Sequence, residues 1–213
     1  STCADNRYEV LLNLLLKTNV NALILEKFLF QRIDDYSNVG KALAETKTPT
    51  WVNCPMRLMQ PYSKFPTLIN RDVPVKIKVS GYNWGLGCNS IHFIDFLRFL
   101  TDCPTSSVKM NLSKYMETTL GRGNFLEFFG EVLVHNKRGD ELQLICLKDS
   151  EKLEKRFSIQ ISNNPNTFLI TFDSTGITFD DNYPNSQSVS HYHETYQSEL
   201  THLIVESILS SGH

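Results

Sequence analysis

The stretch Gly81–Thr101, GYNWGLGCNSIHFIDFLRFLT, places a glycine-punctuated polar loop directly before a strongly apolar helix. A helix that is hydrophobic nearly all round is expected to be buried. Cys88, His92 and Asp95 follow the spacing i, i+4 and i+7, so the helix brings them to one face. An imidazole and a carboxylate on a buried helix indicate either a functional site or a core histidine held by hydrogen bonds.

The composition around this helix is that of an ordinary globular protein. The chain has 213 residues, of which 41% are hydrophobic and 21% charged, enough for a sizeable core. A net charge of −2 without a Lys/Arg cluster argues against nucleic-acid binding. The apolar run Val10–Leu16 is too short to span a bilayer, and no signal peptide is recognisable. We therefore expect a cytoplasmic protein with no membrane partner.

Cysteine and histidine spacing gives little support for metal or thiol chemistry. The five cysteines are scattered and include no CxxC pair, which argues against a disulfide framework and a structural zinc site. His191, His193 and Glu194 could ligate a metal, but an exposed H-x-H at a helix start is more often polar surface. Cys88 beside His92 could act as a nucleophile, whereas its apolar setting favours an inert buried thiol. We expect no metal site.

Helices and strands alternate in the first quarter of the chain. A helix is predicted from Asp5 to Thr18, with Asp5 as its N-cap, and another from Asp34 to Thr46. Short apolar runs at Asn21–Lys27 and Thr50–Cys54 predict strands. This α-β-α-β order favours part of a doubly wound parallel sheet.

The pattern becomes mainly β after Pro61. A short helix is predicted at Tyr62–Asn70, and the alternation over Val73–Ser80 predicts a half-buried strand. Beyond the apolar helix, hairpin-like turns separate six predicted strands, which favours a mostly antiparallel sheet. These strands are Val108–Met116, Leu126–Asn136, Glu141–Leu147, Arg156–Ser162, Thr167–Phe172 and Ile177–Phe179.

A last helix is predicted at about Ser190–Ser211, ending at Gly212. Its inward residues should be Tyr196, Leu200, Leu203, Ile204 and Ile208. The fold class is thus a partial Rossmann-like α/β segment, residues 1–55, followed by an α+β domain, residues 56–213. In the second domain a mostly antiparallel sheet is covered by helices, and the helix at 190–211 packs back.

Three short segments together resemble the glucose–fructose oxidoreductase/inositol dehydrogenase family (Gfo/Idh/MocA). Leu25-Glu26-Lys27 is similar to the family's Glu-Lys-Pro at the end of a Rossmann strand. Asn53–Tyr62, with Arg57, resembles the strand and Arg-containing turn that enter the second domain. Ile91–Asp95 resembles the family's Gly-Ile-His-x-x-Asp on the helix over the substrate. The resemblance implies a Rossmann domain joined to a mostly antiparallel sheet.

The resemblance also implies an NAD(P)-dependent oxidoreductase that transfers hydride between nicotinamide and a sugar or polyol hydroxyl. His92 would be the acid/base, since the usual histidine pKa lies near neutral pH, and Lys27 its partner at the reacting oxygen. Glu26 and Lys27 would contact the cofactor, NAD or NADP. The residues expected to contact the substrate are Arg57, Tyr62, Asn83, Trp84, Cys88, Asn89 and Asp95.

The sequence departs from the family pattern at several positions. No G-x-G-x-x-G phosphate loop is present, so the resemblance begins within the second half of the nucleotide-binding domain. We expect these residues alone to bind NAD(P) poorly and to be inactive, and activity to belong to a longer form. Phe28 stands where the family has proline, and Cys88 where it often has aspartate.

Two readings of the chain's role therefore stay open. One is the sugar or polyol dehydrogenase, and the other is a non-catalytic carbohydrate-binding or oligomerisation module derived from that family. In either case the resemblance implies a homodimer or higher homo-oligomer formed through the large sheet.

Overall fold

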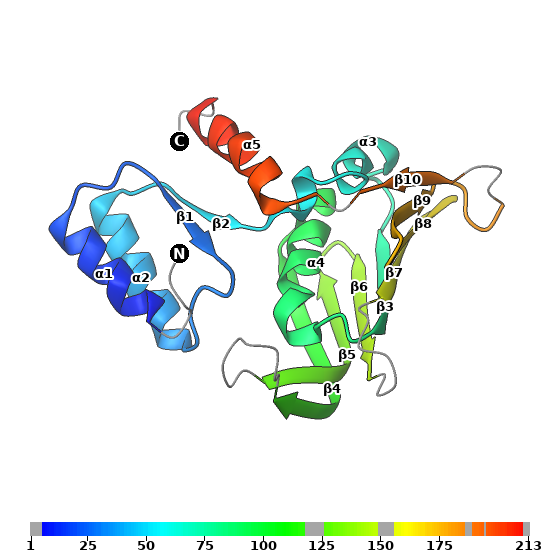
Figure 1. Cartoon of the computed structure of the whole chain (residues 1–213), viewed down its shortest axis with the longest axis horizontal. Coiled ribbons are helices and arrows are strands. Elements are labelled where there is room, and N and C mark those ends of the chain that lie inside the picture. Colours follow the sequence, from blue (N-terminus) through cyan, green and yellow to red (C-terminus); the bar gives the residue numbers. More distant parts are fainter. Residues whose placement is uncertain (1–5, 118–125, 149–155, 186–188, 194, 211–213) are drawn as a thin grey trace. The chain divides into compact units, whose positions relative to one another are not determined.

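The structure, a computed structural model, describes residues 6–117, 126–148, 156–185, 189–193 and 195–210. Its contacts divide the chain into two units. One comprises the chain up to Cys54 together with the residues from Ile204 onward, and the other runs from Pro55 to Leu203. Figure 1 shows residues 6–54 of the first unit in blue to cyan and its residues 204–210 in red, and the sheet of the second unit in teal to orange.

The first unit is a small α/β arrangement with the predicted α-β-α-β order. Its elements are α1 (Arg7–Lys17), β1 (Leu23–Glu26), α2 (Ile33–Thr46) and β2 (Thr50–Asn53). The two strands are parallel, and their register pairs Glu26 with Asn53 at the carboxyl ends. The residues that form its core are Leu11, Leu15, Leu25, Phe30 and Val39. Asp5, the predicted N-cap of the first helix, lies outside the described residues.

The second unit begins with short helical turns and continues into a large sheet. The turns are η1 (Pro55–Leu58), η2 (Tyr62–Lys64) and α3 (Phe65–Leu68), and β3 (Lys76–Tyr82) and α4 (Leu86–Thr101) follow. The remaining strands are β4 (Thr105–Glu117), β5 (Leu126–Asn136), β6 (Glu141–Leu147), β7 (Arg156–Asn163), β8 (Asn166–Asp173), β9 (Gly176–Asp180) and β10 (Ser190–Tyr192).

Eight strands form this sheet in the order β10-β9-β8-β7-β3-β6-β5-β4. Every neighbouring pair is antiparallel except β3 and β6, so the predicted mostly antiparallel sheet is confirmed. β3 lies between β6 and β7, which are later in the chain. Gly81 permits this close approach, because a Cβ there would lie 2.2 Å from the Arg156 carbonyl oxygen and 2.5 Å from Phe157 Cα.

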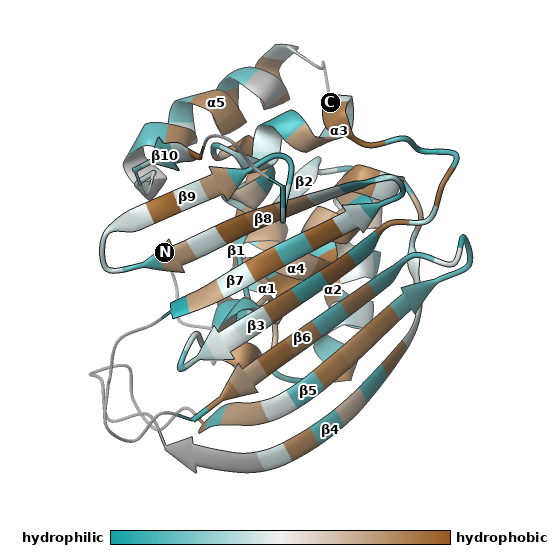
Figure 2. Cartoon of the chain, turned by 90° about the vertical axis from the view of Figure 1, so that its right-hand side faces the viewer, coloured by the Kyte–Doolittle hydropathy of each residue, from teal (hydrophilic) through white to brown (hydrophobic). Residues whose placement is uncertain are grey.

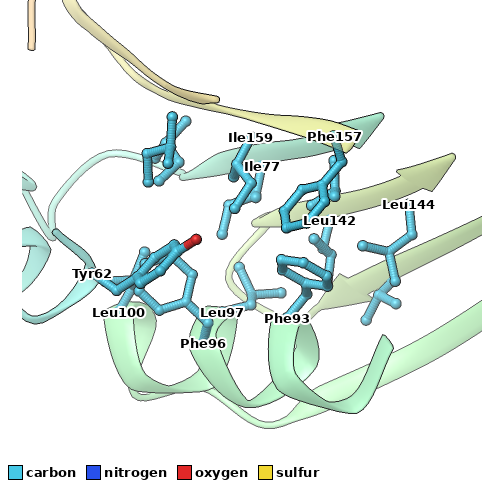
Figure 3. Close-up of a cluster of buried hydrophobic side chains, with 14 of the residues drawn as sticks. Tyr62, Ile77, Phe93, Phe96, Leu97, Leu100, Leu142, Leu144, Phe157 and Ile159 are labelled. Atoms are coloured by element: carbon cyan, nitrogen blue, oxygen red, sulfur yellow. The ribbon is translucent and has the colours of Figure 1, made fainter. Parts of the chain in front are cut away.

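α4 packs on one face of the sheet, as the apolar sequence predicted. Figure 3 shows Phe93, Phe96, Leu97 and Leu100 of α4 pointing toward the strands, where they meet side chains such as Leu144. The alternation of buried and partly exposed positions along the strands directs every second side chain into this layer. Figure 2 looks onto the opposite face, where hydrophilic and hydrophobic residues alternate in bands.

The prediction for the chain's last segment was wrong at its beginning. Ser190–Tyr192 is not helical but forms β10, paired antiparallel with β9, and the helix α5 (Gln197–Ser210) starts later. Tyr196 therefore precedes the helix and is 73% exposed, although Leu200 is buried as predicted. The extended pairing with a neighbouring strand outweighs a local helical pattern here. Gly212, the predicted helix end, lies outside the described residues.

A buried ionic cluster closes the turn between β5 and β6. Asp140 is fully buried, and its carboxylate accepts hydrogen bonds from Arg138 Nε at 2.8 Å, Asn136 Nδ2 at 2.7 Å and the Val75 N–H at 2.7 Å. Burial would raise the pKa of the Asp140 carboxyl, but these hydrogen bonds and the Arg138 charge together hold that pKa below its usual range.

Asp140→Asn is expected to lower the free energy of unfolding of the second unit by about 1–3 kcal/mol at neutral pH, because a charge-assisted pair is lost and a buried donor is orphaned. A lowered folded-state pKa stabilises the fold above the ordinary aspartate pKa, and this contribution disappears as the pH falls through the folded-state value. Urea unfolding measured at several pH values should therefore show less acid dependence in the variant. Asp102→Asn, at an exposed position, is the control, with almost no change expected. An equal loss in both variants would contradict the role of the cluster.

Candidate functional site

The start of α4 is held by a carboxylate from the sheet. Gly85 occupies the N-cap with a φ of 80°, a conformation that favours glycine. Glu127 Oε1 on β5 accepts hydrogen bonds from the Gly87 N–H at 2.6 Å and the Phe128 N–H at 2.9 Å. A negative charge at a helix N-terminus is favourable, so Glu127 orients the part of α4 that carries the predicted site.

Trp84, directly before α4, is packed inside a group of aromatic rings. It is 1% exposed, and its Nε1–H donates to the Ile145 carbonyl oxygen at 2.9 Å. Its ring centroid lies 5.5 Å from that of Phe93 and 6.1 Å from that of Phe157. Phe157 in turn stacks on Phe172, with centroids 5.1 Å apart. These rings form a rigid wall, because edge-to-face and stacked pairs both add to the stability of the packing.

A pocket of about 200 Å³ lies against this aromatic wall, within the second unit. Its lining comes from η1 and η2, from the first turns of α4 and from β7, β8 and β9. The residues that line it are Pro55, Met56, Met59, Tyr62, Trp84, Asn89, His92, Phe93, Phe157, Phe172 and Ile177. An apolar pocket with a few convergent polar groups is the usual form of a small-molecule site.

The pocket brings together four of the predicted site residues, namely Tyr62, Trp84, Asn89 and His92. Asn89 is oriented by the hydrogen bond from its Nδ2 to the Trp84 carbonyl oxygen, at 2.6 Å. His92 lies one turn further along α4; it is half-buried, with its Nδ1 fully enclosed. A histidine, an asparagine and a tyrosine thus line a mainly apolar space.

Arg57 and Asp95, both predicted to contact substrate, are not among the residues that line the pocket and pair with each other; a substrate contact by either stays a prediction. The Arg57 guanidinium donates to both carboxylate oxygens of Asp95, with Nε to Oδ2 at 3.1 Å, and it stacks over the Phe99 ring at 5.4 Å. This bidentate pair joins η1 to α4, two elements that contribute to the pocket lining.

Asn83 and Cys88 are also outside the pocket lining. Asn83 has a φ of 50° and donates its backbone N–H to the Leu147 carbonyl oxygen at 3.1 Å, which shapes the loop before α4. Cys88 is a half-buried cysteine on the first turns of α4. Both residues therefore belong to the frame around the site, and their predicted substrate contacts stay predictions.

Glu26 and Lys27 lie at the carboxyl end of β1 in the first unit. Glu26 Oε1 accepts a hydrogen bond from Asn53 Nδ2 at 2.6 Å, across the parallel strands. Asn53 is 6% exposed, and its Oδ1 has no hydrogen-bond partner among the described residues. Arg7 is also buried and donates to the carbonyl oxygens of Glu26, Phe28 and Leu29, which fixes the turn after β1.

Sequence reasoning did not identify several residues of these two regions as functional. The pocket is also lined by residues from strands that are distant in sequence, namely Phe157, Phe172 and Ile177. The alternation of apolar and polar residues along a strand predicts only that such a side chain points inward, and not that it lines a pocket. Glu127 and Asn53 form hydrogen bonds to residues of other elements. Such contacts cannot be recognised from the local sequence. Met56 and Met59 lie inside the segment that carried the Arg57 marker, so that marker had pointed to the right region.

The described part of the chain holds no group of three or more His, Cys, Asp and Glu side chains that could share a metal ion. His191 and His193 are exposed, and Glu194 lies outside the described residues. No helix in the described ranges combines the length and apolarity that crossing a bilayer requires.

No family model and no curated protein sequence matches the chain. Solved structures do match its fold. A candidate NADPH-dependent oxidoreductase from Desulfitobacterium hafniense has 13% identity and a TM-score of 0.68, and the match covers 100% of this chain and 69% of that one. A dehydrogenase from Chromobacterium violaceum has 11% identity and a TM-score of 0.68, with 99% and 67% covered. The transcriptional regulator Gal80p from Kluyveromyces lactis has 17% identity and a TM-score of 0.70, with 98% and 64% covered.

The chain spans about two thirds of the length of each of these relatives. At such low identity the match shows the fold alone, and that fold carries both oxidoreductases and a regulator. The chain therefore has the fold of the Gfo/Idh/MocA-type oxidoreductases, as its three sequence markers predicted.

Proposed function

We propose that this chain forms the substrate side of a nicotinamide-dependent oxidoreductase, in which His92 exchanges a proton with the reacting hydroxyl. The observation that supports this most is the position of His92 on the lining of an apolar, aromatic pocket. Oxidation of an alcohol requires a base for the hydroxyl proton as the hydride leaves, and imidazole suits that task. The resemblance implies that the alcohol is a sugar or polyol.

The proposed cofactor is NAD or NADP. Its nicotinamide is proposed to bind at the carboxyl ends of β1 and β2. Ligands of open α/β sheets bind at the carboxyl ends of the strands. Glu26 offers a carboxylate there, and the Oδ1 of Asn53 is a buried acceptor without a partner among the described residues. When bound, the nicotinamide would accept or donate the hydride. Lys27 as the partner of His92 stays a prediction, as does a homodimer formed through the sheet.

The nicotinamide site can be tested by comparing NADH with reduced nicotinamide mononucleotide, which lacks the adenine half. Since the sequence contains no pyrophosphate-binding loop, both should bind weakly and with dissociation constants within about threefold of each other. Backbone amide shifts of Glu26, Lys27 and Asn53 in heteronuclear NMR spectra are the measurement, with adenosine monophosphate as the matched control. Absence of shifts with both dinucleotide and mononucleotide would contradict the proposal.

A non-catalytic module is the second candidate function. The specific observation in its favour is that the fold matches the regulator Gal80p with a TM-score of 0.70, no lower than for the oxidoreductases. The substitution of Cys88 for the family's usual aspartate points the same way. Hydride transfer that depends on His92 would favour the oxidoreductase over the non-catalytic module.

A further inference from the structure

We infer that the pocket beside His92 accepts a small alcohol with an apolar body and one or two polar groups, rather than a free sugar or polyol. This inference rests on the proposed function, because it concerns the substrate of the same site. It follows from the chemistry of the lining, from the volume of the pocket and from the hydrogen bonds within its wall.

The lining is poor in polar groups. Only three of its eleven residues, Tyr62, Asn89 and His92, carry a polar side chain that is not an indole. The indole Nε1–H of Trp84 donates to the Ile145 carbonyl oxygen, and Asn89 Nδ2 already donates to the Trp84 carbonyl oxygen. Little hydrogen-bonding capacity therefore remains for a ligand.

A free hexose or inositol does not suit such a lining. Each carries five or six hydroxyl groups, and each hydroxyl removed from water without a partner weakens binding. Three polar side chains cannot satisfy hydroxyls that project from every side of a ring. A molecule with a single hydroxyl needs only one or two partners, which His92 and Asn89 can supply.

The remaining wall favours an apolar ring. Phe157 and Phe172 stack nearly parallel, at an interplanar angle of 13°, and both line the pocket, while Met56 and Met59 have flexible thioethers that adapt to a ligand's shape. The volume of about 200 Å³ suits one six-membered ring with a small substituent, since an apolar cavity of about 150 Å³ binds benzene.

The test compares cyclohexanol with myo-inositol, which share a six-membered ring and differ in the number of hydroxyls. The chain has two tryptophans, Trp51 and Trp84, so a Trp51→Phe variant leaves Trp84 in the pocket wall as the only tryptophan emitter. Cyclohexanol should change its fluorescence saturably, at concentrations about tenfold or more below those at which myo-inositol does. Equal or tighter binding of myo-inositol, or no saturable response to cyclohexanol, would overturn the inference.

A matched pair of methionine variants in the same background locates the binding. Met59→Gln adds a polar group to the lining and should weaken cyclohexanol binding about fivefold. Met110→Gln, on β4, changes a residue that is 68% exposed and outside the lining, so binding should be unaltered. Equal effects of the two would also overturn the inference. Because the titration needs no cofactor, preferred binding of myo-inositol rejects this inference alone, whereas hydride transfer independent of His92 rejects the proposed function.

Discussion

Replacing His92 by glutamine is expected to slow hydride transfer by about 10²–10⁴-fold, the usual contribution of a general acid–base residue. Glutamine keeps a polar, hydrogen-bonding side chain of similar reach but cannot exchange a proton near neutral pH. Binding of the substrate should therefore change much less than its turnover. Turnover is measured on the longer form expected to carry the activity, as oxidation of NADH in the presence of a carbonyl substrate. Ligand binding is followed separately on this chain, through Trp84 fluorescence in the Trp51→Phe background.

His135→Gln is the matched control for this substitution. His135 lies on β5, is half-exposed and does not line the pocket, with Nδ1 3.9 Å from a carboxylate oxygen of Glu141. Its replacement should leave turnover within about twofold of the wild type, since surface substitutions rarely reach a distant site. Turnover that survives in His92→Gln would remove this residue from the chemistry. A longer form that binds ligand in the pocket but never transfers hydride would favour the non-catalytic module.

Replacing Phe65 by alanine is expected to destabilise the second unit by about 3–5 kcal/mol, as for other large-to-small core substitutions. Phe65 is fully buried in α3, and its ring contacts Phe96 of α4, Phe168 of β8 and Phe179 of β9, with centroids 5.3–5.9 Å away. Three separate elements thus meet on one side chain. Tyr62 packs on the same Phe96 ring at 5.6 Å, so the cavity would also loosen the pocket wall.

Leu68→Ala provides the comparison for Phe65, because it removes apolar atoms from the same short helix at a side chain that is 37% exposed. Its cost should stay below about 1 kcal/mol. Urea unfolding followed by Trp84 fluorescence in the Trp51→Phe background reports on the second unit alone. Similar midpoints for the two variants would show that Phe65 does not carry the packing assigned to it.

The local pattern of apolar residues predicted helices and strands well where its period matches the buried face of the element. The apolar run after Gly85 is a helix, α4, whose Phe93, Phe96, Leu97 and Leu100 side chains are buried against the sheet, while most of its other positions are only partly buried. The alternation over Val73–Ser80 predicted a half-buried strand, and this stretch overlaps β3, in which Ile77 and Val79 are buried. The same reasoning failed at Ser190–Tyr192, where pairing with β9 decides the conformation and no local preference reveals it.

The candidate site was predictable only in part. His92, Asn89, Trp84 and Tyr62 were identified from a motif and its neighbourhood, and the structure gathers them around one pocket. Arg57 and Asp95 came from the same family markers, and in the structure they form an ion pair that joins η1 to α4. Whether either also contacts substrate stays a prediction. A motif shows that a residue type is needed, but not whether its charge meets a ligand or another side chain.

By itself the sequence determined a buried helix that presents a histidine, an α/β beginning and a mostly antiparallel sheet, because these follow from the periodicity of apolar residues. Only the tertiary structure decided what surrounds that histidine. Phe157 and Phe172 arrive from β7 and β8, and Glu127 from β5 holds the start of α4. The lining of a pocket depends on contacts between elements distant in sequence. The apolar lining, which limits the chemical class of the ligand, therefore became visible only from the packing of the strands against the helix.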